Sequence, residues 1–160
     1  MSFTCKQIGI IETGYEKPED MPIQPAGSDM KGTILLYDEY IEGLESIELF
    51  SHLILLYKFH KADRVKLRVT PFMDSNERGI FATRAPIRPN HIGLSVVRLT
   101  GIEGNRLYID KIDVINGTPL IDIKPYIPRF DVISEANNGW LPDDVDLKKI
   151  KSDDRFGVDG

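Results

Sequence analysis

The chain has 160 residues, which fits one domain with a hydrophobic core of useful size. Its hydrophobic content of 41% and charged content of 28% are typical of a soluble globular protein. The net charge of −5 argues against a protein that coats nucleic acid without specificity, because such binding depends on cations that neutralise phosphates. A local basic patch remains compatible with this charge.

The cysteine and histidine content and the length of the apolar runs argue against disulfide-bonded, metal-binding and membrane-spanning proteins. Cys5 is the single cysteine, so no intrachain disulfide and no thiolate metal cluster can form. The three histidines lack paired ligand spacing, and we expect no metal. No apolar run approaches the roughly 20 residues of a membrane helix, and the first residues lack the pattern of a secretory signal. These features predict a cytoplasmic protein without a membrane span.

The amino-terminal part predicts strands separated by one long loop. Residues 3–13 alternate in hydropathy as a strand does, while residues 14–31 hold three prolines and four acidic residues, which is loop composition. A loop of this length in a small domain is either flexible or functional. Residues 32–36 and 40–41 predict short strands, and the apolar residues in 44–50 fit one helical turn.

The middle of the chain contains two runs of different character. Residues 51–60 are apolar on both faces, as expected of a central or barrel strand. Residues 65–69 alternate apolar and basic side chains with a period of two. This alternation is typical of a strand with a solvated outer face, and its basic side also suits an RNA backbone.

The second half predicts a hairpin and one more strand. Residues 94–102 and 106–112 are alternating, β-branched runs joined by Glu103-Gly104-Asn105, a short loop that contains glycine. Residues 120–123 predict the next strand. Six or seven strands with at most a few short helices indicate a mainly β fold, a single small antiparallel β-barrel.

Apolar density drops from Arg129 onward. A turn is expected at residues 137–139, and Pro142 is placed to open a short helix. We therefore expect a barrel domain over residues 1–131 and a C-terminal extension, a short helix or partly ordered tail, over residues 132–160. The sequence has neither GxGxxG nor GxxxxGK[ST], so the dinucleotide and P-loop folds are poor candidates.

Residues 81–95 are the strongest candidate for a binding site. They place two arginines, two prolines, an asparagine and a histidine between apolar runs. Proline fixes φ and pushes the preceding residue to extended geometry, so the guanidinium groups lie on stiffened backbone. An ordinary surface loop can share this composition, but loops also carry function. A second polar cluster, Asn116-Gly117-Thr118-Pro119, follows one hairpin later, and the two loops are expected to converge at one end of a sheet.

Five segments together resemble one protein family. They are Ile8–Ile11, Leu49–Leu53, Gly79–Arg84, Arg88–Ser95 and Asn116–Tyr126. Over roughly residues 3–131 the chain resembles the TrmO family, also called TsaA-like or YaeB-like. The resemblance implies a small β-barrel that forms a homodimer and binds S-adenosylmethionine outside the Rossmann-type methyltransferase fold. It also implies a reaction, methylation of N6 of N6-threonylcarbamoyladenosine 37 in the anticodon loop of tRNA.

The resemblance also implies which residues contact the cofactor. They lie in the long loop, at the end of strand 51–60, in the Arg/Pro-rich stretch and in the later turn: Gln24, Pro25, Ala26, His60, Lys61, Arg84, Leu94, Asn116, Gly117, Thr118 and Pro119. Backbone at Gly117 and Pro119 suits close approach to adenosine. The Arg84 guanidinium suits the methionine carboxylate.

The reaction type limits what the protein must supply. Methyl transfer is an in-line displacement at a sulfonium, which mainly requires orientation and exclusion of water. The carbamoyl group acidifies the acceptor amine, so a modest base suffices. Asp122 is our candidate base, and Lys124 or Tyr126 would hold the threonyl carboxylate or the nucleobase. Arg88, Asn90 and Tyr126 are the candidate substrate-binding residues, because bases splayed out of an RNA loop stack on aromatic or guanidinium planes.

Structural alternatives stay open for these residues. Asp122 is also suited to pair with Arg84 or Arg88, and Tyr126 to lie in the core. His52 is interpreted as a buried histidine with its hydrogen bonds satisfied. Two other functions remain: a methyltransferase acting on a small molecule or protein, and a non-catalytic S-adenosylmethionine-binding sensor or partner module.

Overall fold

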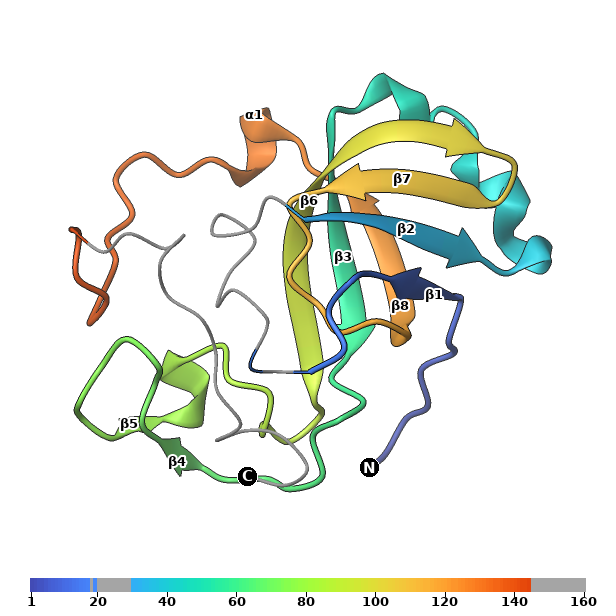
Figure 1. Cartoon of the computed structure of the whole chain (residues 1–160). Helices are drawn as coiled ribbons and strands as arrows, with labels where there is room; N and C mark the ends of the chain where they lie inside the picture. Colours follow the sequence, from blue (N-terminus) through green and yellow to red (C-terminus); the bar gives the residue numbers. More distant parts are fainter. Residues whose placement is uncertain (18, 20–29, 145–160) are drawn as a thin grey trace.

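Six antiparallel strands close into a barrel in the order β1-β2-β7-β6-β3-β8, so each strand pairs with two neighbours (Figure 1). The structure is a computed structural model that describes residues 1–17, 19 and 30–144. The barrel strands are β1 (Gly9–Glu12), β2 (Lys31–Leu36), β3 (His52–Lys58), β6 (Ile92–Glu103), β7 (Arg106–Asp110) and β8 (Thr118–Pro125). The expected mainly β fold with one small antiparallel barrel is confirmed.

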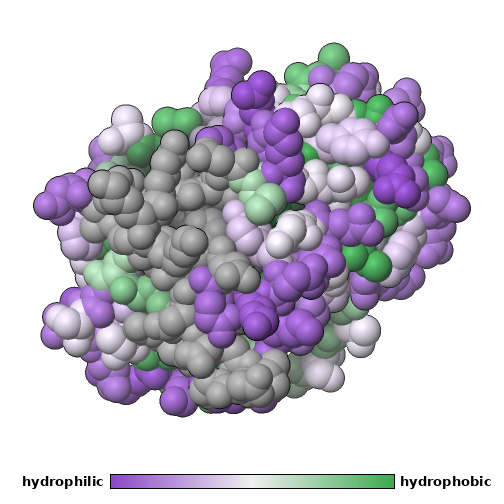
Figure 2. Space-filling view, in the orientation of Figure 1, coloured by the Kyte–Doolittle hydropathy of each residue, from purple (hydrophilic) through white to green (hydrophobic). Residues whose placement is uncertain are grey.

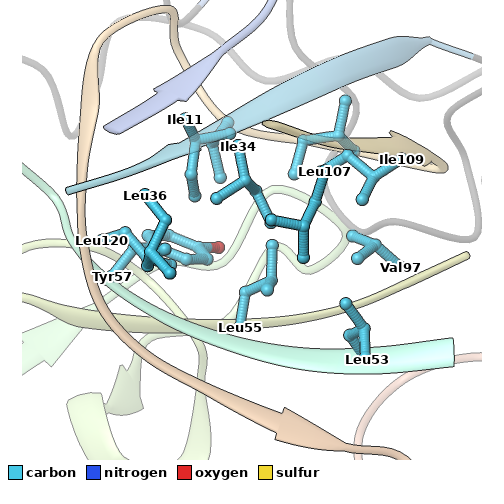
Figure 3. Close-up of a cluster of buried hydrophobic side chains, with 12 residues drawn as sticks. Ile11, Ile34, Leu36, Leu53, Leu55, Tyr57, Val97, Leu107, Ile109 and Leu120 are labelled. Carbon is cyan, nitrogen blue, oxygen red and sulfur yellow. The ribbon is translucent and has the colours of Figure 1, made fainter. Parts of the chain in front are cut away.

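Burial alternates along the strands, as a closed barrel requires. In β3, Leu53, Leu55 and Tyr57 are buried, whereas Ile54 and Leu56 between them keep partial exposure on the outer face. The inward side chains form one hydrophobic cluster (Figure 3). Its members come from all six strands and from the β7–β8 connection: Ile11, Ile34, Leu36, Leu53, Leu55, Tyr57, Val97, Leu107, Ile109, Ile112, Val114 and Leu120.

The connection between β3 and β6 is much longer than a hairpin turn. Residues 59–91, hereafter the lobe, lie below the barrel in Figure 1 and contain β4 (Arg68–Val69), β5 (Arg78–Gly79) and the 3-10 helix η5 (Ile80–Ala82). The lobe has its own small core of Val69, Ile80, Ala85 and Ile87, with Ala62 and Phe72 packed against it. It is therefore a second packing unit built into what would otherwise be a β-hairpin.

Several local predictions are confirmed and three are wrong. The β6–β7 hairpin turns at Gly104, whose φ of +61° favours glycine, and the expected helical turn in 44–50 is η4 (Ile47–Leu49). Residues 40–41 are not a strand: they belong to the 3-10 helix η3 (Asp38–Leu44), in which Tyr40 and Leu44 pack against the barrel core.

The other two errors concern strand length. Instead of a strand over residues 3–13, the structure has the four-residue strand β1. The residues before Ile8 are exposed and pack against no hydrophobic core. In residues 65–69 only the last two pair with β5. Lys66 and Leu67 form backbone hydrogen bonds with Ile87 and Ile80 of the lobe instead.

Beyond β8 the described residues form one short α-helix, α1 (Pro128–Asp131), which begins with proline at its first position. The described residues that follow, 132–144, contain no helix or strand, and Gly139 takes the expected turn with a φ of +59°. The helix expected from Pro142 extends outside the described residues. Among the described residues, no helix has the length and apolar character needed to span a membrane.

Candidate active site

Three strand ends meet at one end of the barrel, hereafter the rim. The register places Lys58 at the end of β3 opposite Ile92 at the start of β6, and Tyr57 opposite Leu120 near the start of β8. Two connections leave the barrel here: the lobe, and the segment that leads into β8 (Figure 1). The two loops singled out in the sequence therefore belong to the same end of the molecule, as expected.

The Arg/Pro segment, residues 83–91, is held in shape by its own backbone. The Arg88 guanidinium donates through Nη1 to the carbonyl oxygen of Thr83 at 2.9 Å. His91 has a positive φ of +49°, and its Nδ1 lies 2.8 Å from the carbonyl oxygen of Pro86. Arg88 thus stabilises the loop that carries Arg84, while exposed Asn90 lies in the same loop. Their roles as substrate contacts stay predictions.

The turn Asn116–Pro119 is fixed by β1 and by the segment that follows it. The Asn116 side-chain oxygen accepts from the Thr13 backbone N–H at 3.0 Å, and the Gly117 N–H donates to the Ile11 carbonyl at 2.9 Å. Gly117 has a φ of +83°, and a Cβ built there would meet no atom within 4 Å. These hydrogen bonds hold the turn against β1, and space is open beside the backbone of its glycine.

A hydrogen-bonded chain of three side chains lies between the two loops. Tyr57 and Ser95 are buried neighbours from β3 and β6, and their hydroxyl oxygens are 2.9 Å apart. Ser95 donates to a carboxylate oxygen of Asp113 at 2.6 Å. With its only hydrogen given to Asp113, Ser95 accepts the hydrogen of Tyr57. Asp113 lies three residues before Asn116, so the barrel interior is linked to the base of the turn.

Arg84, in the lobe, interacts electrostatically with the Tyr57–Ser95–Asp113 hydrogen-bond network. Burial raises the pKa of Asp113 to about 7, and the opposing effects are the hydrogen bond from Ser95, the Asp113 backbone N–H and the positive charge of Arg84. Burial and the charge of Asp113 raise the pKa of Tyr57, which Ser95 and Arg84 partly offset. Because its charge acts on both groups, Arg84 lies within electrostatic reach of Tyr57 and Asp113.

The two residues that follow β3 also lie at the rim. His60 is partly buried, and burial, together with the nearby charge of Lys61, lowers the pKa of His60. Lys61 is exposed. A neutral imidazole at neutral pH is suited to hydrogen bonding with a ribose hydroxyl. Gln24, Pro25 and Ala26, the other predicted cofactor contacts, lie outside the described residues.

Leu94 and Asp122 share the outer face of the sheet. The register aligns Leu94 of β6 with Leu56 of β3, and Leu56 with Asp122 of β8. With neighbouring strands about 4.8 Å apart, Leu94 and Asp122 are separated by about 10 Å. Asp122 does not pair with Arg84 or Arg88, the partners the sequence had offered it: its carboxylate lies 2.7 Å from the Lys124 ammonium. An ion pair on a surface of this exposure adds little stability.

Tyr126 lies away from the rim. Its backbone N–H bonds to the carbonyl of His52 at 3.0 Å, and the two rings meet edge to face with centroids 6.4 Å apart. Eight residues of extended chain, about 26 Å, separate Thr118 from Tyr126. His52 is only partly buried and contacts the Ser51 hydroxyl at 2.7 Å, so its interpretation as a buried histidine is wrong. One chain does not bring Tyr126 to the Asn116–Pro119 turn.

Gly93 fixes where Tyr57 lies. A Cβ on Gly93 would collide with the Tyr57 ring, at 2.7 Å from its Cζ, and with Phe59. We expect Gly93→Ala to destabilise the fold by about 1–3 kcal/mol, as overpacking does, and to disturb the Tyr57–Ser95 contact. Denaturant unfolding measures the first effect. Gly43→Ala is the matched control because a Cβ there meets nothing within 4 Å, and equal losses for both variants would contradict the prediction.

Comparison with known proteins agrees with this architecture. Residues 10–132 match the family model of the tRNA-methyltransferase O N-terminal domain. A Pyrococcus abyssi protein described as a probable S-adenosyl-L-methionine-binding protein is 50% identical over 153 residues, covering 94% of this chain and 83% of that protein. The human tRNA (adenine(37)-N6)-methyltransferase is 33% identical over 164 residues, covering 91% of this chain and 37% of the human enzyme.

A solved structure shows the same fold. The crystal structure of TrmO from Pseudomonas aeruginosa superposes with a TM-score of 0.75 at 39% identity, over 89% of this chain and 64% of that one. The family model runs from β1 to just past α1, so it spans both the barrel and the lobe. The chain belongs to the tRNA-methyltransferase O (TrmO) family.

Proposed function

We propose that this protein transfers a methyl group from S-adenosylmethionine to N6 of N6-threonylcarbamoyladenosine 37 in tRNA. Family membership supports the reaction class, and relatives described as S-adenosylmethionine-binding proteins support the methyl donor. The observation that carries the proposal is that the charge of Arg84, from the lobe, acts on Asp113, which lies three residues before the Asn116–Pro119 turn. In the proposed site, Arg84 would supply a cation, Asp113 a carboxylate and Gly117 open backbone.

The residues at the rim fit the proposed cofactor. Arg84 is exposed and would pair with the methionine carboxylate. The open space beside Gly117 would admit an adenosine, and Leu94, 44% exposed, offers an apolar contact on the outer face. When bound, S-adenosylmethionine supplies an electrophilic methyl group. The protein would orient the acceptor and exclude water, which is most of what such a displacement requires.

Proton removal from the acceptor amine needs a base. Asp122 remains our proposal, because its carboxylate shares the outer face with Leu94 and is held by Lys124. Lys124 itself, or Tyr126, would hold the threonyl carboxylate or the nucleobase.

The distance between Tyr126 and the turn supports a homodimeric enzyme. If Tyr126 acts at the same methyl group as Gly117, it must come from a second copy of the chain, since one chain separates the two by about 26 Å. The outer face of β3 and β6 carries Leu94 together with partly exposed Leu56 and Val96, a surface suited to such pairing. Sedimentation equilibrium of the chain measures this directly.

We further propose that the domain of residues 1–131 carries the activity, that residues 132–160 are an extension of it, and that the protein works in the cytoplasm. Two other functions remain possible interpretations of the same site. The net charge of −5 favours a small-molecule or protein acceptor, and a sensor or partner module would bind the cofactor without turnover.

Incubation with labelled S-adenosylmethionine and threonylcarbamoylated tRNA tests the proposal. We expect label at N6 of the modified adenine, and for Asp122→Asn a loss of turnover of roughly a hundredfold or more with cofactor binding retained, as for removal of a general base. Glu39→Gln, an exposed carboxylate on η3, is the control. Cofactor binding without label in tRNA would reject the proposal. Label in another acceptor would then identify the second reading, and no turnover at all the third.

A further inference from the structure

Positive charge is concentrated in one part of this acidic chain. Between Lys58 and Arg88 there are eight lysines and arginines and three acidic residues, a net charge of +5, in a chain whose net charge is −5. The rest of the chain therefore has a net charge of −10. This cationic segment coincides with the lobe and the end of β3, so its positive charges belong to one region of the fold (Figure 1).

One backbone hydrogen bond brings two of these cations close together. The Lys66 N–H donates to the Ile87 carbonyl at 2.9 Å, which places Lys66 beside Arg88. Arg68 lies directly opposite Gly79 and pairs with Glu77, whereas exposed Lys66 has no acidic partner within 4.0 Å in the described part of the chain. The lobe thus presents positive charge that its own carboxylates only partly neutralise.

Exposed apolar and aromatic side chains lie among these cations. Phe81 of η5 is 76% exposed and Leu67 is 65% exposed. The two are close, because Ile80, next to Phe81, donates its N–H to the Leu67 carbonyl at 2.9 Å. Trp140, from beyond the barrel, donates its indole N–H to the Ala82 carbonyl at 2.7 Å. On the lower left of Figure 2, where Figure 1 places the lobe, hydrophilic side chains are interspersed with apolar ones.

This combination matches the chemistry of a single-stranded RNA loop. Cations neutralise phosphates, and exposed aromatic rings stack on bases that a loop leaves unpaired. A protein partner would be expected to meet a more continuous apolar patch. Stacking on Phe81 would occur three residues from Arg84, so a base held there would lie beside the proposed cofactor site.

Building on the function proposed above, we propose that the lobe is the surface that receives the RNA loop, with Phe81 as a stacking platform and Lys66 and Arg68 as phosphate contacts. The anticodon loop would then be bound by the same insertion that carries Arg84. In this arrangement the barrel is a support, and the acidic remainder of the chain makes no phosphate contacts.

Binding of a fluorescent anticodon stem-loop RNA, measured by anisotropy over a range of salt concentrations, tests the proposal. We expect Lys66→Glu to weaken binding roughly tenfold and to reduce the slope of log K against log salt by about one or more. Phe81→Ala should weaken binding by roughly 5- to 150-fold at every salt concentration, the value of one stacked base. Both side chains are exposed, so circular dichroism and S-adenosylmethionine calorimetry should match the unmodified protein.

Two matched controls lie outside the lobe. Arg106→Glu reverses an exposed charge at the β6–β7 turn, far from the lobe in Figure 1, and Phe3→Ala removes an aromatic ring of 74% exposure. Controls that weaken binding as much as the lobe variants would overturn the proposal, as would lobe variants that bind RNA normally. If the unmodified protein methylates tRNA while the lobe variants bind it normally, only the lobe assignment fails. If no methyl group reaches tRNA but the lobe variants alone lose RNA binding, only the enzymatic function fails.

Discussion

Replacing Arg84 with alanine is expected to weaken S-adenosylmethionine binding by roughly ten- to a hundredfold. A hydrogen bond to a charged group contributes about 1.5–3 kcal/mol, and each 1.4 kcal/mol is a factor of ten in affinity. Arg84→Lys should recover part of this loss, because lysine keeps the charge but lacks the planar fork that binds a carboxylate through two nitrogens. Isothermal titration calorimetry measures both variants.

A second consequence of Arg84→Ala does not depend on any ligand. The positive charge of Arg84 lowers the pKa of Asp113, so its removal should raise that pKa further above about 7. NMR titration of the Asp113 carboxyl group reports it, with Arg106→Ala, at the start of β7, as a control. An unchanged pKa would show that Arg84 does not face Asp113. A shifted pKa with unchanged cofactor affinity would restrict Arg84 to a structural role.

Replacing Asp113 with asparagine is expected to stabilise the protein at alkaline pH. Burial raises the folded-state pKa of Asp113 to about 7, well above the value of about 3.9 for an unperturbed aspartate. The folded state therefore holds this proton more tightly than the unfolded chain does. The resulting stabilisation is complete below about pH 4 and is lost as the pH rises through 7.

The unmodified protein and Asp113→Asn should therefore differ in how their free energy of unfolding depends on pH. Between pH 5 and pH 8 the free energy of unfolding of the unmodified protein should fall by an amount on the order of a few kcal/mol relative to Asp113→Asn. Urea unfolding at the two pH values measures it, with Glu39→Gln as an exposed control. Parallel pH profiles for Asp113→Asn and the unmodified protein would mean that the carboxyl group is well solvated, despite its bond to Ser95.

The gain in stability should be accompanied by a loss of function. Asparagine keeps the shape of the side chain and a contact with Ser95 but removes the negative charge that faces Arg84. If that charge positions the guanidinium, Asp113→Asn will bind S-adenosylmethionine more weakly than the unmodified protein at pH 8, and the difference will narrow at pH 5, where Asp113 is protonated. Buried ionisable groups that reduce the stability of the folded state are common at functional sites, where their charge is needed.

Strand patterns made the barrel predictable, because inward and outward side chains alternate with a period that sequence reading detects. The strand pattern of residues 51–60 and the glycine turn at Gly104 each corresponded to an observed element. The error at residues 40–41 arose because a short apolar pair has no period of its own. There, packing of Tyr40 and Leu44 on the core selected a 3-10 helix.

The candidate site was only partly predictable. Arg84 and the Asn116–Pro119 turn stood out because loops rich in proline, arginine and glycine are poor packing material. Asp113 was missed, since in the sequence it is one acidic residue in a run that looks like ordinary strand and loop. A signal was available: Ser95 shares the inward face of its strand with Gly93 and Val97, and Asp113 lies between the apolar residues Ile112 and Val114, so each polar group requires a partner. Which partner each one finds depends on the register of β3 against β6, which no local pattern encodes.

Lys58 and Ile92 face each other across two adjacent strands, although 33 residues of chain run between them. Ring closure of the sheet is complete without those residues, and extra chain in a connection adds little entropic cost once its ends are fixed. The insertion can therefore diverge in length and chemistry while the six strands stay as they are. Grafting a different insertion between these two anchor points would be a rational way to redirect the scaffold toward another nucleic acid.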